Sequence, residues 1–275
     1  MSLEYLIPIS KPHAIQSAIF ALEWQGELSD QALTNIQNLS NSLKSDFPEA
    51  LVQKTLRINL GVEPNKPPEK HSENDMLGGM SFIRKGKFGD VVSNLNVSRT
   101  NCVVVIREYD RWIPTIEAVM RYFGILLPVI MKEISINVIA LQYTDVFTWK
   151  DEPENLNLGE VFSENSPFIA PNVLSQKSLW HCHHGYWIHE FDDLDGNCLD
   201  NINIDTVDDS NDRAIHITTS HKFVLNNPLR FSTSNYLGSI ESIQQKLHLH
   251  NKEILKKLLS REVCEKINLT NSEGV

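Results

Sequence analysis

The stretch that decides the fold is AIQSAIFALEW, residues 14–24. Its residues alternate imperfectly in the manner of a strand, with Phe20 and Leu22 on one face and Ile15 and Ile19 on the other. A strand that is apolar on both faces is typical of the middle of a sheet, because neither face meets water. The sequence therefore predicts a central strand here.

A helix is predicted directly after this strand. Ser29 is suited to an N-cap, and Leu28 and Leu33 have the spacing of a hydrophobic staple around it. Apolar residues then recur at helical spacing up to a proline at position 48, namely Leu33, Ile36, Leu39, Leu43 and Phe47. The first unit is therefore a strand followed by a helix.

Residues 112–147 couple a helix to a strand in the opposite order. Pro114 suits the first turn of a helix, and Pro128 must kink or end it because proline removes a backbone donor. The helix carries one apolar stripe at spacings of three and four, made of Ile116, Val119, Phe123 and Leu127. Residues 134–147 then form a long predicted strand.

The segments between and after these units are predicted to be mostly strands. In the first half we expect a strand at 51–60, a surface loop at 61–80, and a hairpin of 89–96 and 101–109. In the second half we expect strands at 179–191, 198–207 and 214–224, then a helix capped by Ser239 and a short one started by Ser260.

Together these elements predict an α+β fold with mostly antiparallel sheet and packing helices. The chain is interpreted as a single domain, 1–275, made of two loosely similar βα-type halves, 1–150 and 172–275. The polar loop 151–171 joins the halves. The similarity of the halves rests on element order alone, since no residue-level repeat is present.

Composition and charge exclude several classes of protein. The net charge of −10 and the pI near 5.5 argue against a duplex nucleic-acid binder, which needs a basic face. Four cysteines form no Cys-x-x-Cys pair, and the N-terminus lacks the pattern of a signal peptide. The nearly apolar run 122–131 is too short to span a bilayer. These features predict a cytoplasmic protein with reduced thiols and no membrane partner.

The chain resembles a sporadically distributed, uncharacterised bacterial and archaeal protein family. The similarity lies in the first strand with its capped helix, in Trp112 with the long helix up to Pro128, and in IALQYTDVF at 139–147. It extends to the closing segment, with Leu247-His248 followed by Leu255, Leu258 and Leu259. The resemblance implies no catalytic residues, because the family has no agreed activity. Sporadic occurrence is typical of mobile or defence-linked genes.

The strongest candidate for chemistry is the histidine-rich segment WHCHHGYWIHE, residues 180–190. On a strand, His181, His183 and His189 share one face, and His216 on a neighbouring strand could add a ligand. Imidazole ligands of this kind suit zinc or iron. His181 and His189 would lie roughly 26 Å apart on an extended strand, so a shared ion needs a bend between them. The alternative is a polar, partly exposed strand face.

A second candidate is the basic tip formed by Arg84, Lys85 and Lys87 beside Phe82 and Phe88. Basic residues interleaved with aromatic ones can bind single-stranded nucleic acid, but a single tip on an acidic protein is more often a solvated loop. No nucleophile elbow or phosphate loop is present, so no catalytic residue is assigned.

These observations favour a non-catalytic, protein-binding or regulatory accessory subunit of a defence or toxin-linked system. Its expected partner is another protein or a second copy of the chain, and it needs no cofactor. The alternative is a metal-dependent enzyme that uses zinc or iron on the His181/His183 strand.

Overall fold

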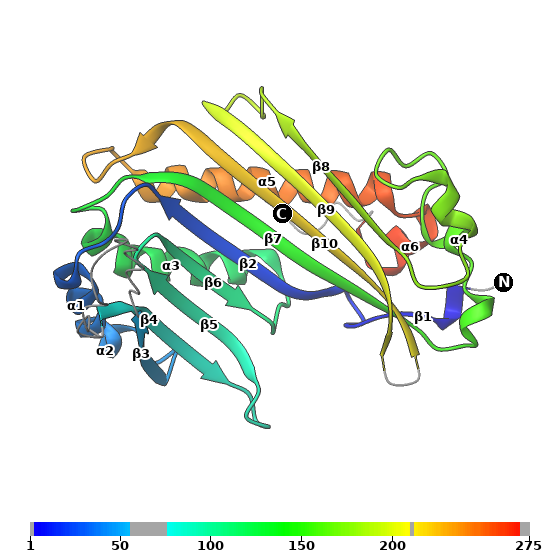
Figure 1. Cartoon of the computed structure of the whole chain (residues 1–275), viewed down its shortest axis with the longest axis horizontal. Helices are drawn as coiled ribbons and strands as arrows, with labels where there is room; N and C mark the ends of the chain where they lie inside the picture. The colour runs from blue at the N-terminus through cyan, green and yellow to red at the C-terminus, as the bar shows by residue number, and fades with distance from the viewer. Residues whose placement is uncertain (1–2, 56–75, 210–211, 270–275) are drawn as a thin grey trace, which may run out of the picture.

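A single ten-stranded antiparallel sheet forms the centre of the computed structural model, which describes residues 3–55, 76–209 and 212–269 (Figure 1). The strand order is β3-β4-β5-β6-β2-β7-β10-β9-β8, and β1 pairs with β7. The strands are β1 (Leu6–Pro8), β2 (Ile15–Trp24), β3 (Glu49–Thr55), β4 (Met76–Lys85), β5 (Val91–Ser98), β6 (Asn101–Ile106), β7 (Ile136–Trp149), β8 (His181–Ile188), β9 (Gly196–Asp209) and β10 (Asp212–Leu229). The α+β prediction is thus confirmed.

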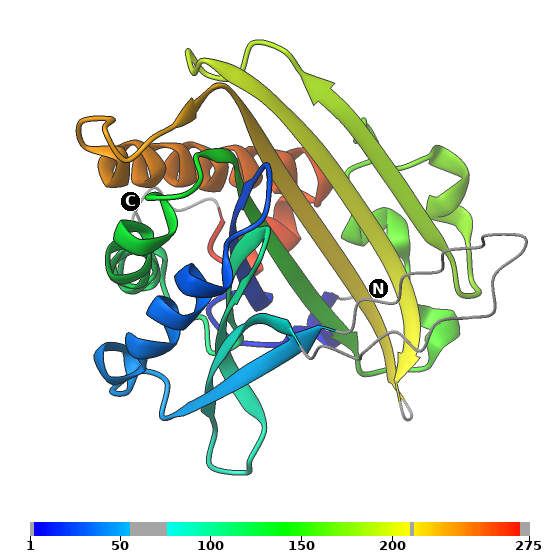
Figure 2. The same ribbon diagram turned by 60° about the vertical axis from the view of Figure 1, so that its left-hand side comes forward.

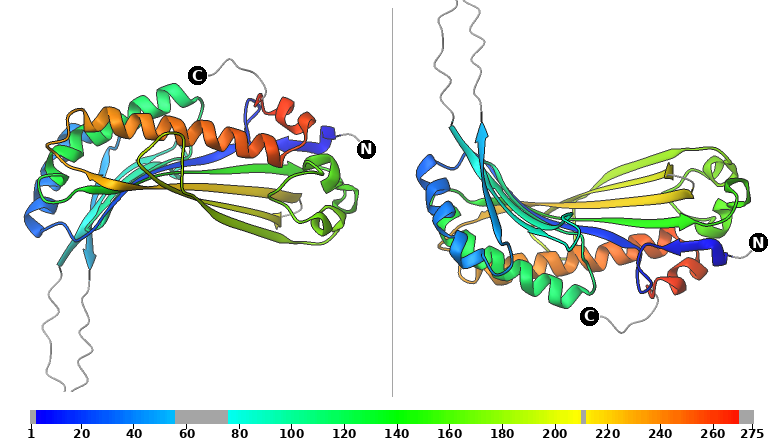
Figure 3. Two further views of the ribbon diagram at one scale, coloured as in Figure 1. Left: turned by 90° about the horizontal axis from the view of Figure 1, so that it is seen from above. Right: turned by 90° about the horizontal axis from the view of Figure 1, so that it is seen from below.

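Two long helices cover one face of this sheet. Figure 2 shows α3 (Trp112–Ile130) and α5 (Tyr236–Leu258) on the same side of the strands, and Figure 3 shows α5 running along the sheet. The shorter helices are α1 (Asp30–Asn38), α2 (Ser40–Leu43), α4 (Leu158–Val161) and α6 (Arg261–Lys266), with 3₁₀ turns η1 (Leu3–Tyr5), η2 (Pro153–Asn155) and η3 (Pro171–Ser175).

The prediction of a central strand at residues 15–24 is confirmed. β2 lies between β6 and β7, and its Phe20 is opposite Leu141 of β7 in the register. Both side chains are fully buried on the face that the helices cover. Full burial of one such side chain is worth roughly 1.5–3 kcal/mol. Ile19 on the other face is only partly buried, so β2 is central in the sheet but is covered by helices on one face.

The prediction for Pro128 is also confirmed, since α3 ends at Ile130, two residues after it. Among the helices that the structure describes, α3 is the one long and apolar enough to cross a membrane by length and composition alone. Its buried residues pack into the core under the sheet, and this packing accounts for its apolar character.

The predicted loop at 61–80 is wrong for its last five residues. Residues 76–80 belong to β4, which pairs with β3 and β5, and the rest of that loop lies outside the described residues. A Cβ atom on Gly79 would lie 2.3 Å from the carbonyl oxygen of Val97, so this glycine allows close strand approach. The predicted strand at 51–60 is seen as β3 up to residue 55, and 56–60 are not described.

Three further boundaries differ from the sequence prediction. The first helix breaks at Leu39, so that α1 and α2 are separate. Asn235, not Ser239, caps α5: its side chain accepts from the Gly238 amide in a left-handed backbone conformation, which asparagine tolerates. β1 was not predicted at all, because three residues carry too little periodicity.

The polar loop 151–171 is more ordered and more buried than the sequence predicts. It contains short helical turns, and its apolar residues pack with β7, β9, β10 and α5 into a second buried cluster, including Leu156, Leu158, Val161, Phe162 and Phe168. The sheet itself continues from one half of the chain to the other, since β7 pairs with both β2 and β10.

Candidate functional site

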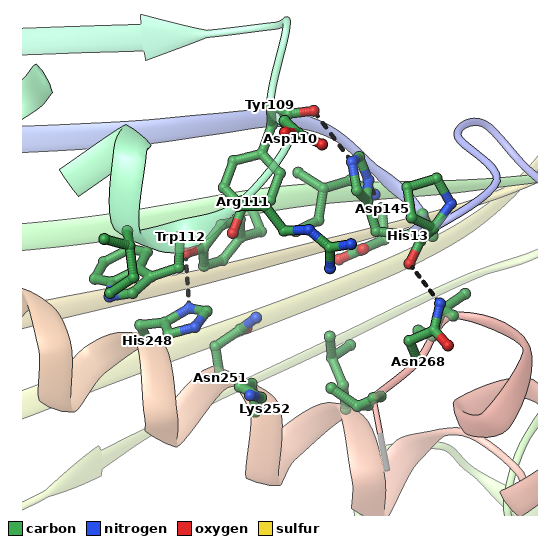
Figure 4. A pocket seen from close by; sticks show the side chains of 18 of the residues that line it. His13, Tyr109, Asp110, Arg111, Trp112, Asp145, His248, Asn251, Lys252 and Asn268 are labelled. Atoms are coloured by element: carbon green, nitrogen blue, oxygen red, sulfur yellow. Dashed lines mark hydrogen bonds between the residues drawn. The ribbon is translucent and has the colours of Figure 1, made fainter. Parts of the chain in front are cut away.

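A cavity of about 480 Å³ lies between the covered face of the sheet and the helices (Figure 4). Its walls come from distant parts of the chain: residues 12–15 and 109–114, two side chains of β7, the α5 segment 248–255, and residues 267–269. Pockets of this size between packed elements are typical binding sites for small molecules.

Asp145 of β7 is the most unusual residue in the cavity wall. The residue is only 2% exposed, and its Oδ2 atom has no hydrogen-bond partner among the described residues. In the strand register it lies opposite Ile15 of β2 and Ile217 of β10, so its neighbours across the sheet are apolar. Burial raises the pKa of Asp145 from 3.8 to about 7, because the charged form loses its hydration.

A stacked aromatic network forms one wall of the cavity. The Tyr143 hydroxyl lies 2.9 Å from His248 Nδ1, and the His248 ring is stacked on Trp112 with centroids 4.1 Å apart and 3° between planes. Burial, aided by the charge of Lys252, lowers the pKa of His248 to about 3. His248 is therefore neutral near pH 7, and its Nδ1 can accept a hydrogen bond from the Tyr143 hydroxyl. This wall therefore consists of a stacked ring pair and the hydroxyl that is hydrogen-bonded to it.

Two cationic side chains, Arg111 and Lys252, also line the cavity. Figure 4 shows Arg111 reaching inward between Asp145 and the α5 residues Asn251 and Lys252. Within the described ranges, neither cation forms an ion pair, although many other lysines and arginines do. One exposed carboxylate, that of Asp110, lies at the same cavity. The arrangement can therefore bind an anionic group beside a buried hydrogen-bonding carboxyl.

A second cluster, Asp200, His221 and His250, lies nearby under α5. His221 of β10 is directly opposite Asp200 of β9, and its Nδ1 is 2.7 Å from Asp200 Oδ1. His250 of α5 places Nε2 2.7 Å from the other carboxylate oxygen. Burial by itself raises the pKa of Asp200, but the hydrogen bonds from His221 and His250 outweigh it and hold that pKa well below its usual range.

These three residues could hold a metal ion. Each offers one ligand atom, and the three atoms lie within 4.8 Å of one another. The carboxamide oxygen of Asn251 is 3.0 Å from His221 Nε2, the ring nitrogen that faces away from Asp200. Asn251 also lines the cavity described above, so the two clusters share a wall.

The histidines that the sequence predicts as metal ligands lie away from this Asp200 cluster. His181 and His183 are exposed on edge strand β8, on the face opposite the helices. His181 and His216 both lie opposite Asp205 of β9, which gives one row across three strands. His189 follows β8 and its Nδ1 is 3.1 Å from the Asn197 carboxamide oxygen. Among the described residues these four histidines form no compact ligand group, and metal binding by them stays a prediction.

The predicted basic tip is largely engaged in ion pairs. Arg84 pairs with Glu108 at 3.3 Å and Lys85 with Glu49 at 2.8 Å, while Lys87 is exposed. Phe82 is fully buried and cannot stack on a base, which corrects its place in the predicted site, whereas Phe88 is 98% exposed. Binding of single-stranded nucleic acid at this tip stays a prediction.

Sequence reasoning missed both clusters, because their members are far apart in the chain. One signal was present: polar residues interrupt the buried stripe of α5 at Gln244, His248 and Asn251, with spacings of four and three. Polar groups are rarely placed on the buried face of a helix without hydrogen-bond partners, so this interruption pointed to a polar site beneath the helix.

Comparison with known proteins gave no match, either among protein-family models or among curated sequences. The resemblance to an uncharacterised family therefore stays a prediction.

Proposed function

We propose that the protein is a non-catalytic regulatory binding protein that takes a small organic anion into the sheet–helix cavity. The ligand carries an acidic group together with an N–H or O–H donor. Its acidic group meets Arg111 and Lys252, and its donor meets Asp145.

The unpaired Oδ2 of Asp145 carries this proposal. A buried oxygen without a hydrogen bond costs the protein about 1–3 kcal/mol, so a ligand donor recovers that free energy once a rotation of the Asp145 side chain presents Oδ2 to the cavity. The oxygen accepts a hydrogen bond whether the carboxyl group is protonated or ionised, although the ionised form accepts more strongly. Because its pKa is about 7, the group can adopt either form near neutral pH, according to the charge of the ligand.

The unpaired cations supply the charge preference. Arginine presents a planar fork of donors that matches a carboxylate or phosphate, and the Arg111 side chain is free of ion pairs within the described chain. Lys252 adds a second positive charge from α5. The exposed Asp110 disfavours an anion on its own side, so the acidic group is expected on the α5 side of Arg111.

The cavity also supports a regulatory role, because it lies where the two halves of the chain meet. Residues 109–114 and segment 248–255 face each other across the cavity. A ligand that contacts both segments links the two halves. Its binding can therefore shift their relative arrangement, and with it the surface that a partner protein meets.

The expected partner is another protein or a second copy of the chain. The two outermost strands support this, since β3 exposes Leu51 and Val52, and β8 exposes Trp187. Outermost strands with exposed apolar side chains can accept a further strand from a partner. A clean monomer with no protein co-purifying from the native host would contradict this part of the proposal.

Ligand binding is tested by thermal unfolding of the purified chain against a panel of amino acids, hydroxy acids and nucleoside monophosphates. A ligand at about one hundred times its Kd adds about 2.7 kcal/mol, which corresponds to a rise in Tm of about 5–10 °C. We expect at least one member to give such a rise. Arg111→Ala should weaken its binding at least about tenfold, since a charge-assisted hydrogen bond is lost.

Arg230→Ala is the matched control, because Arg230 is also exposed and does not line the cavity. It should bind the ligand as the wild type does. A panel without any shift, or an Arg111→Ala variant that binds normally, would contradict the proposed site.

A further inference from the structure

We propose that Asp200, His221 and His250 bind one divalent transition-metal ion of the zinc and iron class. This site adjoins the anion cavity, with which it shares Asn251, and it lies on the opposite face of the sheet from the exposed histidines of β8; its ligands come from β9, β10 and α5.

The three ligand atoms already converge. His221 Nδ1 and His250 Nε2 lie 2.7 Å from the two oxygens of the same carboxylate, and the two imidazole ring centroids are 5.2 Å apart. Metal–nitrogen and metal–oxygen bonds in such sites are about 2.0–2.2 Å. An ion placed among the three atoms therefore needs only a small separation of side chains, which His250 on the helix surface can provide.

A neighbouring residue holds His221 in the orientation that a metal ligand needs. The Asn251 carboxamide oxygen, 3.0 Å away, can accept a hydrogen bond from Nε2–H, so that Nδ1 is the nitrogen left to bind a metal ion in place of its own proton. Asp200 Oδ1 accepts a further hydrogen bond from Cys198 Sγ at 3.6 Å. Metal ligands in proteins are typically fixed by such outer hydrogen bonds.

The site is deep but has an entrance. The side chains of Asp200 and His221 are 0% exposed, whereas that of His250 is 23% exposed. His250 borders a cavity of about 490 Å³, whose other walls include Phe191, Lys246 and Glu253. The ion can enter from this side, and water from the cavity can complete its coordination.

The charge around the entrance does not exclude a cation. Lys246 pairs with Asp192 at 3.2 Å, and Lys256 pairs with Glu253 at 2.8 Å, so two of the three lysines at the cavity are offset by carboxylates. Two imidazoles and one carboxylate favour zinc or iron over calcium or magnesium, which prefer oxygen ligands throughout.

The test uses the full-length chain purified without a polyhistidine tag and stripped with EDTA. Zn²⁺ alone is titrated calorimetrically, and bound metal is measured by elemental analysis. We expect one Zn²⁺ per chain, with affinity reduced at least 100-fold in His250→Ala. His183→Ala is the matched control and should bind as the wild type does, because His183 lies on the opposite face of the sheet.

The opposite pattern would overturn the proposal: zinc lost in His183→Ala but retained in His250→Ala, or no stoichiometric zinc in the wild type. If His250→Ala does not fold, the His181→Ala/His183→Ala double variant decides with Co²⁺. One equivalent of Co²⁺ with the visible absorption of nitrogen and oxygen coordination supports the site, and failure to take up Co²⁺ overturns it. Neither result bears on the anion cavity, whose test depends on Arg111.

Discussion

Replacing Asp145 by asparagine is expected to stabilise the protein at pH 8 and to have little effect at pH 4. Asparagine has nearly the same shape as aspartate but cannot ionise. The wild-type carboxyl group must give up its hydration to ionise inside the protein, since its side chain is buried and Oδ2 has no partner within the described residues.

The direction follows from the raised pKa. Between pH 3.8 and about 7 the folded protein keeps the Asp145 proton while the unfolded chain releases it, so stability falls as pH rises through this window. Above about pH 7 Asp145 is ionised in both the folded and the unfolded protein, so the free energy of unfolding falls no further. The difference between 3.8 and about 7 corresponds to roughly 4 kcal/mol, or about 10 °C in Tm.

The measurement is urea unfolding of wild type and Asp145→Asn at several pH values without added ligand. Their difference in free energy of unfolding should grow from pH 4 to pH 8 and then level off. Asp110→Asn is the control, because that carboxylate borders the same cavity but is exposed. A difference between Asp145→Asn and wild type that does not vary with pH would show that Asp145 ionises as freely inside the protein as in water.

Replacing Asp200 by alanine is expected to destabilise the metal-free protein by about 3–5 kcal/mol. Asp200 accepts hydrogen bonds from His221 and His250, and the His221 side chain is fully buried. Without the carboxylate, the His221 Nδ1 atom loses its partner and cannot reach water, so its desolvation is no longer compensated. Thermal unfolding in EDTA should show a loss of about 10 °C in Tm.

Asp205→Ala is the matched control for this loss. Asp205 is on the same strand but on the opposite face of the sheet, where it lies opposite His181 and His216. The Asp205→Ala substitution should lower the free energy of unfolding by less than about 1 kcal/mol, as is usual for a residue on the surface. Equal losses in the two variants would mean that the Asp200 network adds nothing beyond the strand itself.

The sequence alone was sufficient for the elements with strong periodicity. β2 and α3 were predicted within about two residues because their apolar positions repeat at the spacing of a strand and a helix, and this repeat is a local property of the chain. The caps at Ser29 and Ser260 were predicted for the same reason, since a cap depends on residues three positions apart. The prediction that Gly79 lies in a loop is wrong, because this glycine allows the close approach of strand β5, and a neighbouring strand is not visible in the local sequence.

The sites were decided by tertiary structure. Asp145 looks like any polar residue of a strand until β2 and β10 flank it with apolar side chains, and its altered pKa is a consequence of that burial. Asp200, His221 and His250 are separated by 21 and 29 positions in the chain and meet only because β9 pairs with β10 under α5. Local spacing thus determined strands, helices and caps, whereas convergence of polar atoms required the packed sheet, because burial and distance depend on every neighbour at once.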